Sequence, residues 1–256
     1  MAKGKLSPRQ KMINLMYLVF IAMLAMQIDQ EIIRSYQDTN QSLTDSRTLA
    51  QDKNKIFKIT LDQKAKNSPE SFGPAQVQYT GMESRADDIV NYIEDIKNSL
   101  KTEAGYNSNT DDVEENFSAL NNTEAGTNKF FKGGDSEVPS NTSKELLSKM
   151  SDLKNYIVQN LSSSQDLKSV VDRAKKNLSA DDSKYKKQNK TWLQYKFYNQ
   201  PLIAALSNLE VIQSEVRNLQ SDALSLMLKE KVDADIQFNA YEAIVAGPTA
   251  IQKGET

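Results

Sequence analysis

The sequence contains neither cysteine nor histidine in its 256 residues. Without cysteine the chain has no disulfides, no thiolate chemistry and no cysteine-ligated zinc. Without histidine it lacks the commonest general base, the commonest metal ligand and the usual pH switch. A bacterial protein outside the cytoplasm often has no disulfides, so these absences exclude kinds of chemistry rather than a compartment.

Glycine and proline are also scarce, at nine and six residues. Both interrupt helices, so their scarcity favours long helices, and we expect an all-α fold. Charged residues make up 26% of the chain and hydrophobic residues 38%, and the formal net charge is -2. A charge near zero argues against bulk nucleic-acid binding, and the length allows one or two domains.

Common enzyme signatures are missing, including the P-loop, G-x-G-x-x-G, H-E-x-x-H and G-x-S-x-G motifs. A basic run at Lys184–Lys190 is typical of a solvated surface. We therefore expect no enzyme activity, no cofactor and no metal site. Three acidic pairs lack the glycine and the spacing of a calcium-binding loop: Asp87-Asp88, Asp111-Asp112 and Asp181-Asp182.

The most apolar run lies near the N-terminus, from Met12 to Ile28. It has no charged residue, and as a helix it would cover roughly 25 Å, enough to cross a thin hydrocarbon core. By the positive-inside rule the N-terminus then lies in the cytoplasm and the bulk of the chain on the other side of the membrane. The charges behind this assignment are Lys3, Lys5, Arg9 and Lys11 before the run, and Asp29 and Glu31 after it.

A cleaved signal peptide and a buried core helix are the two other interpretations of this run. Residues 22–25 make a poor cleavage site with no turn after them, and a core helix does not need four cations at one end. We therefore predict a cytoplasmic N-terminus (1–11), one transmembrane helix (12–28), a helical bundle on the other side of the membrane (29–231) and the start of a β-rich domain (232–256).

The membrane helix is predicted to continue beyond the membrane without a break. Ser7 can cap it, Pro8 suits its first turn, and Gln10 has the capping-box spacing. No glycine or proline follows until Pro69, so we expect one helix from about Pro8 to about Lys64, roughly 85 Å long. One apolar stripe continues along it: Ile28, Ile32, Tyr36, Leu43, Ala50 and Phe57.

Apolar residues spaced by three and four predict further helices over 82–100, 145–161 and 167–178. A capping box at Thr142–Glu145 opens the second of these, and a serine run at 162–164 ends it. Residues 105–141 are rich in polar residues and glycine. We expect them to be mostly irregular, with a short helix near Val113–Leu120 and with Phe130 and Phe131 as anchors to a core.

The last helix has the most regular pattern, with apolar residues in two rows of period seven, which indicates a seam between helices, in the bundle or in a dimer. Residues 236–244 alternate in a way that predicts a β-strand. Mutual burial of all these helices favours an antiparallel bundle. The seam residues are Leu202, Leu209, Val216, Leu219 and Leu226, and an aromatic cluster that should close the bundle end precedes them: Trp192, Tyr195, Phe197 and Tyr198.

The membrane helix has no carboxylate, so a proton carrier acting with it would belong to a partner. Arg9, at the cytoplasmic edge, is the cation best placed to pair with a partner carboxylate. Its alternative role is that of a snorkelling anchor bound to lipid phosphate. Asn14 and Tyr17 are candidates for hydrogen bonds between helices, or simply a residue near the helix end and an interfacial aromatic.

The stretch GKLSPRQKMINLMYLVFIAMLAM closely resembles the N-terminus of the GldM (PorM) family, inner-membrane proteins of the type IX secretion and gliding-motility machinery of Bacteroidetes. Looser similarity extends over Trp192–Leu228 and 236–245. The resemblance implies a homodimer with one membrane helix per subunit inside a pentameric ring of the multi-span partner GldL. It also implies further β-rich periplasmic domains and contacts with periplasmic and outer-membrane secretion components.

The resemblance further implies a molecular motor, in which proton-motive force drives protein transport and adhesin movement. In that family the proton-responsive glutamate belongs to GldL, and the membrane-edge arginine falls on Arg9, with Tyr17 carried over as a second candidate. Two alternatives come from other classes of protein. One is a sensory receptor with a helical periplasmic bundle, and the other is a passive scaffold anchored by a single helix.

Overall fold

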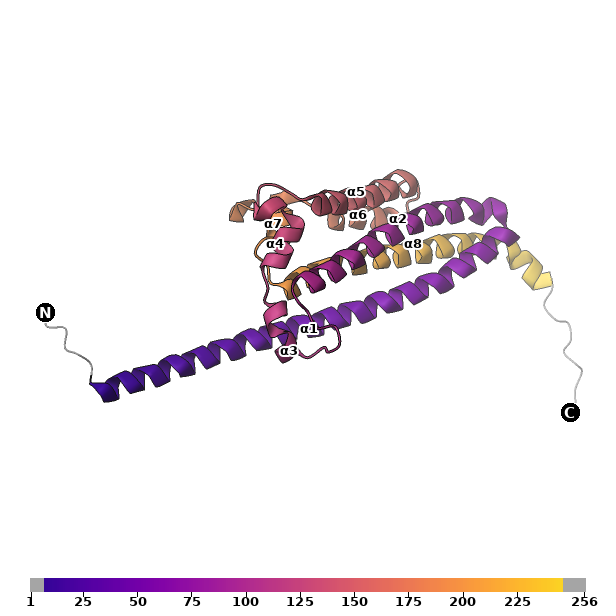
Figure 1. Ribbon diagram of the computed structural model, residues 1–256. Helices are drawn as coiled ribbons and strands as arrows, with labels where there is room; N and C mark the ends of the chain where they lie inside the picture. The colour runs from indigo at the N-terminus through magenta and orange to yellow at the C-terminus, as the bar shows by residue number, and fades with distance from the viewer. Residues whose placement is uncertain (1–6, 246–256) are drawn as a thin grey trace, which may run out of the picture. The chain divides into compact units, whose positions relative to one another are not determined.

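The computed structural model describes the backbone of residues 7–245 and the side chains of residues 7–229. Regular structure in this part of the chain is helical, apart from one isolated bridge between Phe131 and Pro139. Figure 1 labels the helices, which are α1 (Pro8–Asn67), α2 (Pro69–Glu103), α3 (Val113–Leu120), α4 (Glu124–Phe130), α5 (Asn141–Leu161), α6 (Lys168–Asn177), α7 (Trp192–Phe197) and α8 (Leu202–Val245).

α1 is a single helix of 60 residues, as predicted. Ser7 caps it, because its Oγ accepts a hydrogen bond from the Gln10 backbone N–H at 3.3 Å. Of the described helices, α1 alone is long and apolar enough to cross a membrane, judged by length and composition. α2 begins at Pro69, earlier than the apolar pattern indicated, because Pro69 suits a first helical turn.

The chain between α2 and α5 is more ordered than expected. α3 occupies the predicted span, and Asp112 caps it by accepting from the Glu114 and Glu115 backbone N–H groups. α4 was not predicted, and it ends at Phe130, which is buried together with Phe131 as expected. The capping box at 142–145 is wrong in register, because Ser140 accepts from the Ser143 N–H and α5 starts at Asn141.

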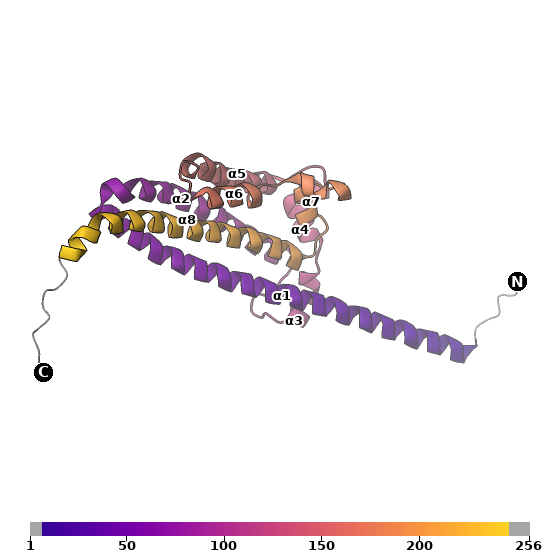
Figure 2. The same ribbon diagram turned by 180° about the vertical axis from the view of Figure 1, so that it is seen from behind.

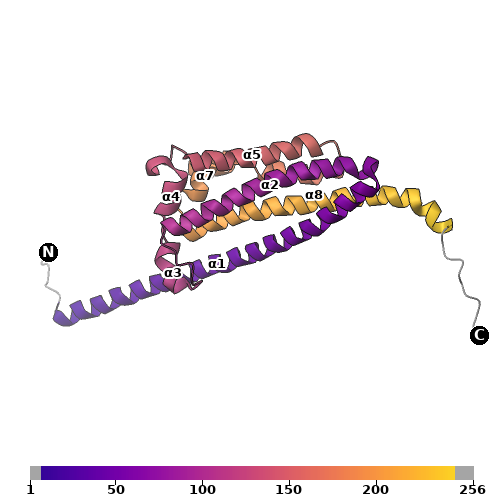
Figure 3. The same cartoon turned by 45° about the vertical axis from the view of Figure 1, so that its right-hand side comes forward.

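The chain forms two compact units. Unit 1 contains residues up to Thr44, Glu94–Lys144 and Asp182–Val211; unit 2 contains Asp45–Ile93, Glu145–Asp181 and the chain from Ile212. In unit 2, α1 and α2 are antiparallel neighbours joined at Ser68, and α8 lies beside them, as Figures 2 and 3 show from two sides. α1, α2 and α8 therefore contribute residues to both units.

Each unit has an apolar core of its own. In unit 1 Ile33 of α1 packs with Val113, Leu120 and Ile203, while stacked rings of Phe130 and Phe197 join α4 to α7 with centroids 3.9 Å apart. Two members of the predicted aromatic cluster, Trp192 and Phe197, are buried in unit 1 with ring centroids 6.0 Å apart, and the closing of the bundle end by the cluster stays a prediction. Unit 2 buries large side chains from α1, α2 and α5: Leu61, Phe72, Tyr79, Met82, Ile89, Leu146, Met150 and Leu153.

The strand predicted over 236–244 is wrong, because α8 continues to Val245. Ile236, Ala240 and Ile244 are also spaced by four, and no glycine or proline lies between Pro201 and Gly247, so the helical hydrogen bonds continue. Residues 246–256 lie outside the described part, and the β-rich domain predicted to begin in 232–256 remains a prediction for them. The basic run at Lys184–Lys190 is exposed, as expected, except that Tyr185 is half-buried.

Candidate functional site

The first part of α1, which we call its bare part, is exposed along its whole surface. From Met12 to Ile28 every residue is exposed, and Tyr17, Leu18 and Phe20 keep 65%, 65% and 58% of their surface open. Arg9 and Asn14 are exposed as well, and Tyr17 lies two helical turns beyond Arg9. An apolar helical surface of this length is stable only in lipid or against other helices, so the three predicted interface residues all lie on a surface that needs a partner or a bilayer.

α1 first contacts the core of unit 1 just after this bare part. Ile33, only 3% exposed, enters the core, and the Arg34 guanidinium bridges Glu31 at 2.8 Å and Glu114 of α3 at 3.0 Å. The Gln37 side-chain amide donates to the Asp111 carbonyl at 2.6 Å. The ion pairs are exposed and contribute little energy, so the apolar contact of Ile33 supplies most of this attachment.

In unit 2, Asn54 connects α1 to α8 through both ends of its side-chain amide. Asn54 Nδ2 donates to the Arg217 carbonyl at 3.1 Å, and Ser221 Oγ donates to Asn54 Oδ1 at 2.6 Å. Asn54 and Ser221 are each only 6% exposed. Since hydrogen bonds are directional, this pair fixes both the rotation of α1 about its axis and its height along α8.

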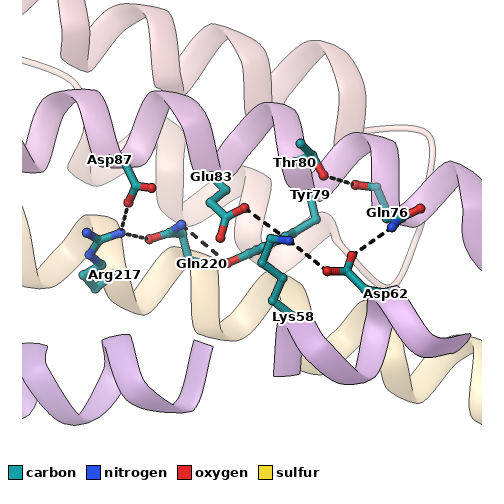
Figure 4. Close-up of polar contacts among 9 residues, drawn as sticks. All are labelled: Lys58, Asp62, Gln76, Tyr79, Thr80, Glu83, Asp87, Arg217 and Gln220. Atoms are coloured by element: carbon teal, nitrogen blue, oxygen red, sulfur yellow. Dashed lines mark hydrogen bonds and ion pairs between the residues drawn. The ribbon is translucent and has the colours of Figure 1, made fainter. Parts of the chain in front are cut away.

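One and two turns further along α1, Lys58 and Asp62 contact α2 (Figure 4). Lys58 Nζ lies 2.9 Å from Asp62 and 3.9 Å from Glu83, and Gln76 Nε2 donates to Asp62 at 2.8 Å. Hydrogen bonds from Lys58 and Gln76 lower the pKa of Asp62. Burial raises the pKa of Glu83, and the nearby carboxylates of Asp87 and Asp62 raise it further.

Polar contacts between α2 and α8 complete this layer (Figure 4). The Arg217 guanidinium contacts the Asp87 carboxylate at 2.5 Å and Gln220 Oε1 at 2.9 Å, and Gln220 Nε2 lies 3.5 Å from the Tyr79 hydroxyl. Tyr79 is 1% exposed, and burial raises the pKa of its phenol. We call Asn54, Lys58, Asp62, Tyr79, Glu83, Asp87, Arg217, Gln220 and Ser221 the polar layer.

The family model of the GldM N-terminal domain matches residues 31–230. The chain belongs to the GldM family. The matched range begins after the apolar run that carried the resemblance, so two separate parts of the chain indicate the same family. No curated protein matches the chain.

Membership places this GldM-family chain in the gliding and type IX secretion machinery, and its long apolar N-terminal helix is consistent with a single membrane span. Within the described residues, no group of three or more acidic residues, histidines or cysteines is arranged to hold a metal ion. The helix α1 connects two kinds of surface. Its N-terminal part is exposed, and its C-terminal part makes directional hydrogen bonds to α2 and α8.

The predicted seam residues of this GldM-family chain lie in its own core. Leu202 and Leu209 are buried in unit 1 and Val216 and Leu219 in unit 2, all at 0% exposure, while Leu226 is half-buried. Sequence reasoning missed the polar layer. Its signal is a row of polar residues at 54, 58 and 62, spaced by four along one face of a helix that also presents Leu61 and Ala65 to the core.

Proposed function

We propose that the chain is the proton-motive-force-driven motor subunit of the type IX secretion and gliding machinery. Two copies form a shaft inside a pentameric ring of a GldL-like multi-span protein in the inner membrane, with the N-termini in the cytoplasm. The observation that carries this proposal is α1, which runs unbroken from Pro8 to Asn67, bare at its start and joined to α2 and α8 near its end.

The bare part of α1 supports a partner that supplies the proton chemistry. Between Met12 and Ile28 the helix has no ionisable side chain except Tyr17, so a proton-binding carboxylate must come from another protein. Arg9 precedes the run and is the cation that such a carboxylate would pair with. Two identical helices cannot pair with all five ring subunits at once. Protonation of one ring carboxylate weakens its ion pair with Arg9 and favours pairing with the next carboxylate, so shaft and ring turn stepwise relative to each other.

The polar layer supports transmission of that motion. An apolar helix contact tolerates slippage, because dispersion and hydrophobic attraction are not directional. The bonds of Asn54 and Asp62 hold α1 in one rotation and one register against α8 and α2. Turning α1 therefore turns the helices of unit 2 with it.

Replacement of Arg9 tests the proposal. Arg9→Ala should abolish secretion and gliding while the chain still co-purifies with its multi-span partner, because the change removes a charge but little packing surface. Arg9→Lys separates the two roles of the residue. A lysine can bind lipid phosphate, but it cannot reproduce the bidentate pairing of a guanidinium with a carboxylate, so we expect it to stay defective.

Lys11→Ala is the matched control, since Lys11 is a second exposed cation two residues away, and we expect it to keep most activity. Normal secretion by Arg9→Ala would exclude a motor role for Arg9. Secretion that persists after the membrane gradient is collapsed would favour the passive scaffold instead.

A further inference from the structure

The basic run before α7 is a feature of unit 1 that the proposed motor does not use. Lys184, Lys186, Lys187 and Lys190 are all exposed, and none of the four forms an ion pair with a carboxylate of the described chain. Only two acidic residues, Asp181 and Asp182, lie beside these lysines in the sequence. The run is thus a local concentration of uncompensated positive charge.

This basic run is held in a defined place. Lys184, Lys186 and Lys187 lie in η2 (Asp182–Gln188), a 3₁₀ segment, and the Lys190 backbone N–H donates to the Tyr185 carbonyl at 3.4 Å. The ring of Tyr185 stacks on Tyr195 of α7 with centroids 4.3 Å apart. Asp182 Oδ1 accepts the Trp192 backbone N–H at 2.6 Å, so one of the two acidic neighbours is already engaged. The lysines therefore project from a structured element, and their loss of freedom on binding a ligand is smaller than in a loose tail.

The same unit contains the apolar run of α1. α1 enters the core of unit 1 at Ile33, five residues or roughly 7.5 Å after Ile28, where it packs against Ile203 at the start of α8. α7 immediately precedes α8 in the chain. In Figures 1 and 2 the orange segment just before α7 lies at the end of unit 1 from which the bare part of α1 projects.

We propose that Lys184, Lys186, Lys187 and Lys190 bind the anionic phospholipid headgroups of the membrane that α1 crosses. The inference rests on the membrane span in the proposed function. Phosphate groups complement the four ammonium charges, and a lysine close to an anionic surface strengthens binding about fivefold. This contact holds unit 1 against tilting, yet it allows rotation in the plane, because lipids are fluid and point charges make no directional bond.

The absence of cysteine makes a direct measurement possible. Gln188→Cys, in the exposed end of η2, gives a single site for a fluorophore. The full chain is reconstituted in phosphatidylcholine vesicles with or without phosphatidylglycerol, and with a quencher on the lipid headgroups. We expect quenching at least several-fold stronger in the anionic vesicles, lost as ionic strength approaches about 1 M, where the Debye length is about 3 Å.

Two sets of charge-removing substitutions sharpen the test. Changing Lys184, Lys186, Lys187 and Lys190 together to Gln should reduce quenching in anionic vesicles to the level in neutral ones. The matched control changes four exposed lysines of unit 2 to Gln and removes the same charge, so it should leave quenching unchanged. These four are Lys53, Lys168, Lys175 and Lys176. Circular dichroism checks that both variants are folded.

Equal quenching in neutral and anionic vesicles, or quenching that survives the substitution of the four lysines at 184–190, would overturn the proposal. Protection of the fluorophore only when an acidic protein is added would assign the lysines to protein docking and would also overturn it. Carbonate-resistant association with vesicles distinguishes failure of the proposed membrane span from failure of the lysine–headgroup contact. If it is lost, the membrane span of the proposed function fails; if it remains without dependence on lipid charge, only the present inference fails.

Discussion

At the scale of single residues, Glu83 has its carboxylate in surroundings that disfavour its charge. Burial is the largest cause of its raised pKa, and the repulsion of Asp87 raises the pKa further, while the attraction of Lys58 opposes both. A carboxyl whose pKa is higher in the folded state than its ordinary value of 4.5 binds its proton more tightly when folded. Its contribution to stability therefore declines as pH rises from about 4.5 through the raised pKa.

Glu83→Gln should accordingly increase the free energy of unfolding at pH 7, and the gain should shrink as the pH is lowered toward 4. Asp62→Asn is the matched substitution, and it should change the free energy of unfolding in the opposite direction. Because hydrogen bonds lower the pKa of Asp62 below 3.8, its loss should destabilise the protein at pH 7 and matter less at acid pH. Urea unfolding at both pH values measures the pair. Equal destabilisation by both at pH 7 would mean that the Lys58 contact outweighs burial.

Two glycines of α2 give a second residue-scale prediction. A Cβ at Gly81 would overlap the Tyr156 phenol, which donates to the Gln78 carbonyl at 3.0 Å and lies under the Arg85 guanidinium. Gly81→Ala should therefore destabilise the protein by about 1–3 kcal/mol through overpacking. A Cβ at Gly73 would meet no heavy atom within 4 Å apart from its chain neighbours and the helix backbone. Because Gly73 directly precedes Pro74, whose ring disfavours a helical residue with a Cβ at that place, Gly73→Ala should bring no gain in stability but should cost less than Gly81→Ala.

Thermal or urea unfolding of the two alanine variants, followed by circular dichroism, measures the contrast within one helix. A stable Gly81→Ala variant would show that Tyr156 can move aside, and Tyr156→Phe, which removes the hydroxyl, would then be expected to cost little.

At the scale of elements, the connection of α1 to α8 can be altered without disturbing packing. Asn54→Leu together with Ser221→Ala replaces both buried partners by apolar groups, a change that is close to neutral for stability. We expect a folded protein that assembles with its partner but secretes less, because the directional contact is gone. Gln63→Leu, an exposed amide on the same helix, is the control. Full secretion by the double variant would contradict transmission through Asn54.

Sequence reasoning was most successful for elements that local chemistry determines. The unbroken course of α1 follows from Ser7, Pro8 and the absence of glycine and proline up to Pro69, and α3 follows from its cap and apolar spacing. α4 was missed because its helical pattern is only seven residues long and contains Gly126, which faces the Phe197 carbonyl and Ala205. The strand at 236–244 was wrong because short apolar runs fit periods of two and four alike.

The polar layer could not be read from sequence for a different reason. Asn54, Asp87 and Arg217 are ordinary polar residues in helices, and only the tertiary arrangement brings Arg217 into contact with the other two across more than 100 positions of sequence. The basic run shows the same limit. The basic run was expected to be a solvated surface, and its exposure agrees, but its place in the same unit as the bare part of α1 comes only from the fold.

At the scale of the whole molecule, the remaining question is which side of the membrane each part occupies. Four cations precede the apolar run and acidic residues follow it, so the positive-inside rule predicts that residue 2 lies in the cytoplasm and the helical units in the periplasm. Since the chain has no cysteine, Ala2→Cys and Ser162→Cys each introduce a unique thiol, the second at an exposed position between α5 and α6.

In intact cells whose outer membrane has been made permeable, a membrane-impermeant maleimide should label Ser162→Cys and not Ala2→Cys. After lysis it should label both, because the bilayer is then the only barrier removed. The two sites also decide between an anchor and a cleaved signal peptide, since cleavage near residue 25 would leave the mature chain without the Ala2→Cys thiol under any condition. Labelling of Ala2→Cys in intact cells would reverse the orientation and remove the cytoplasmic setting that the pairing of Arg9 requires.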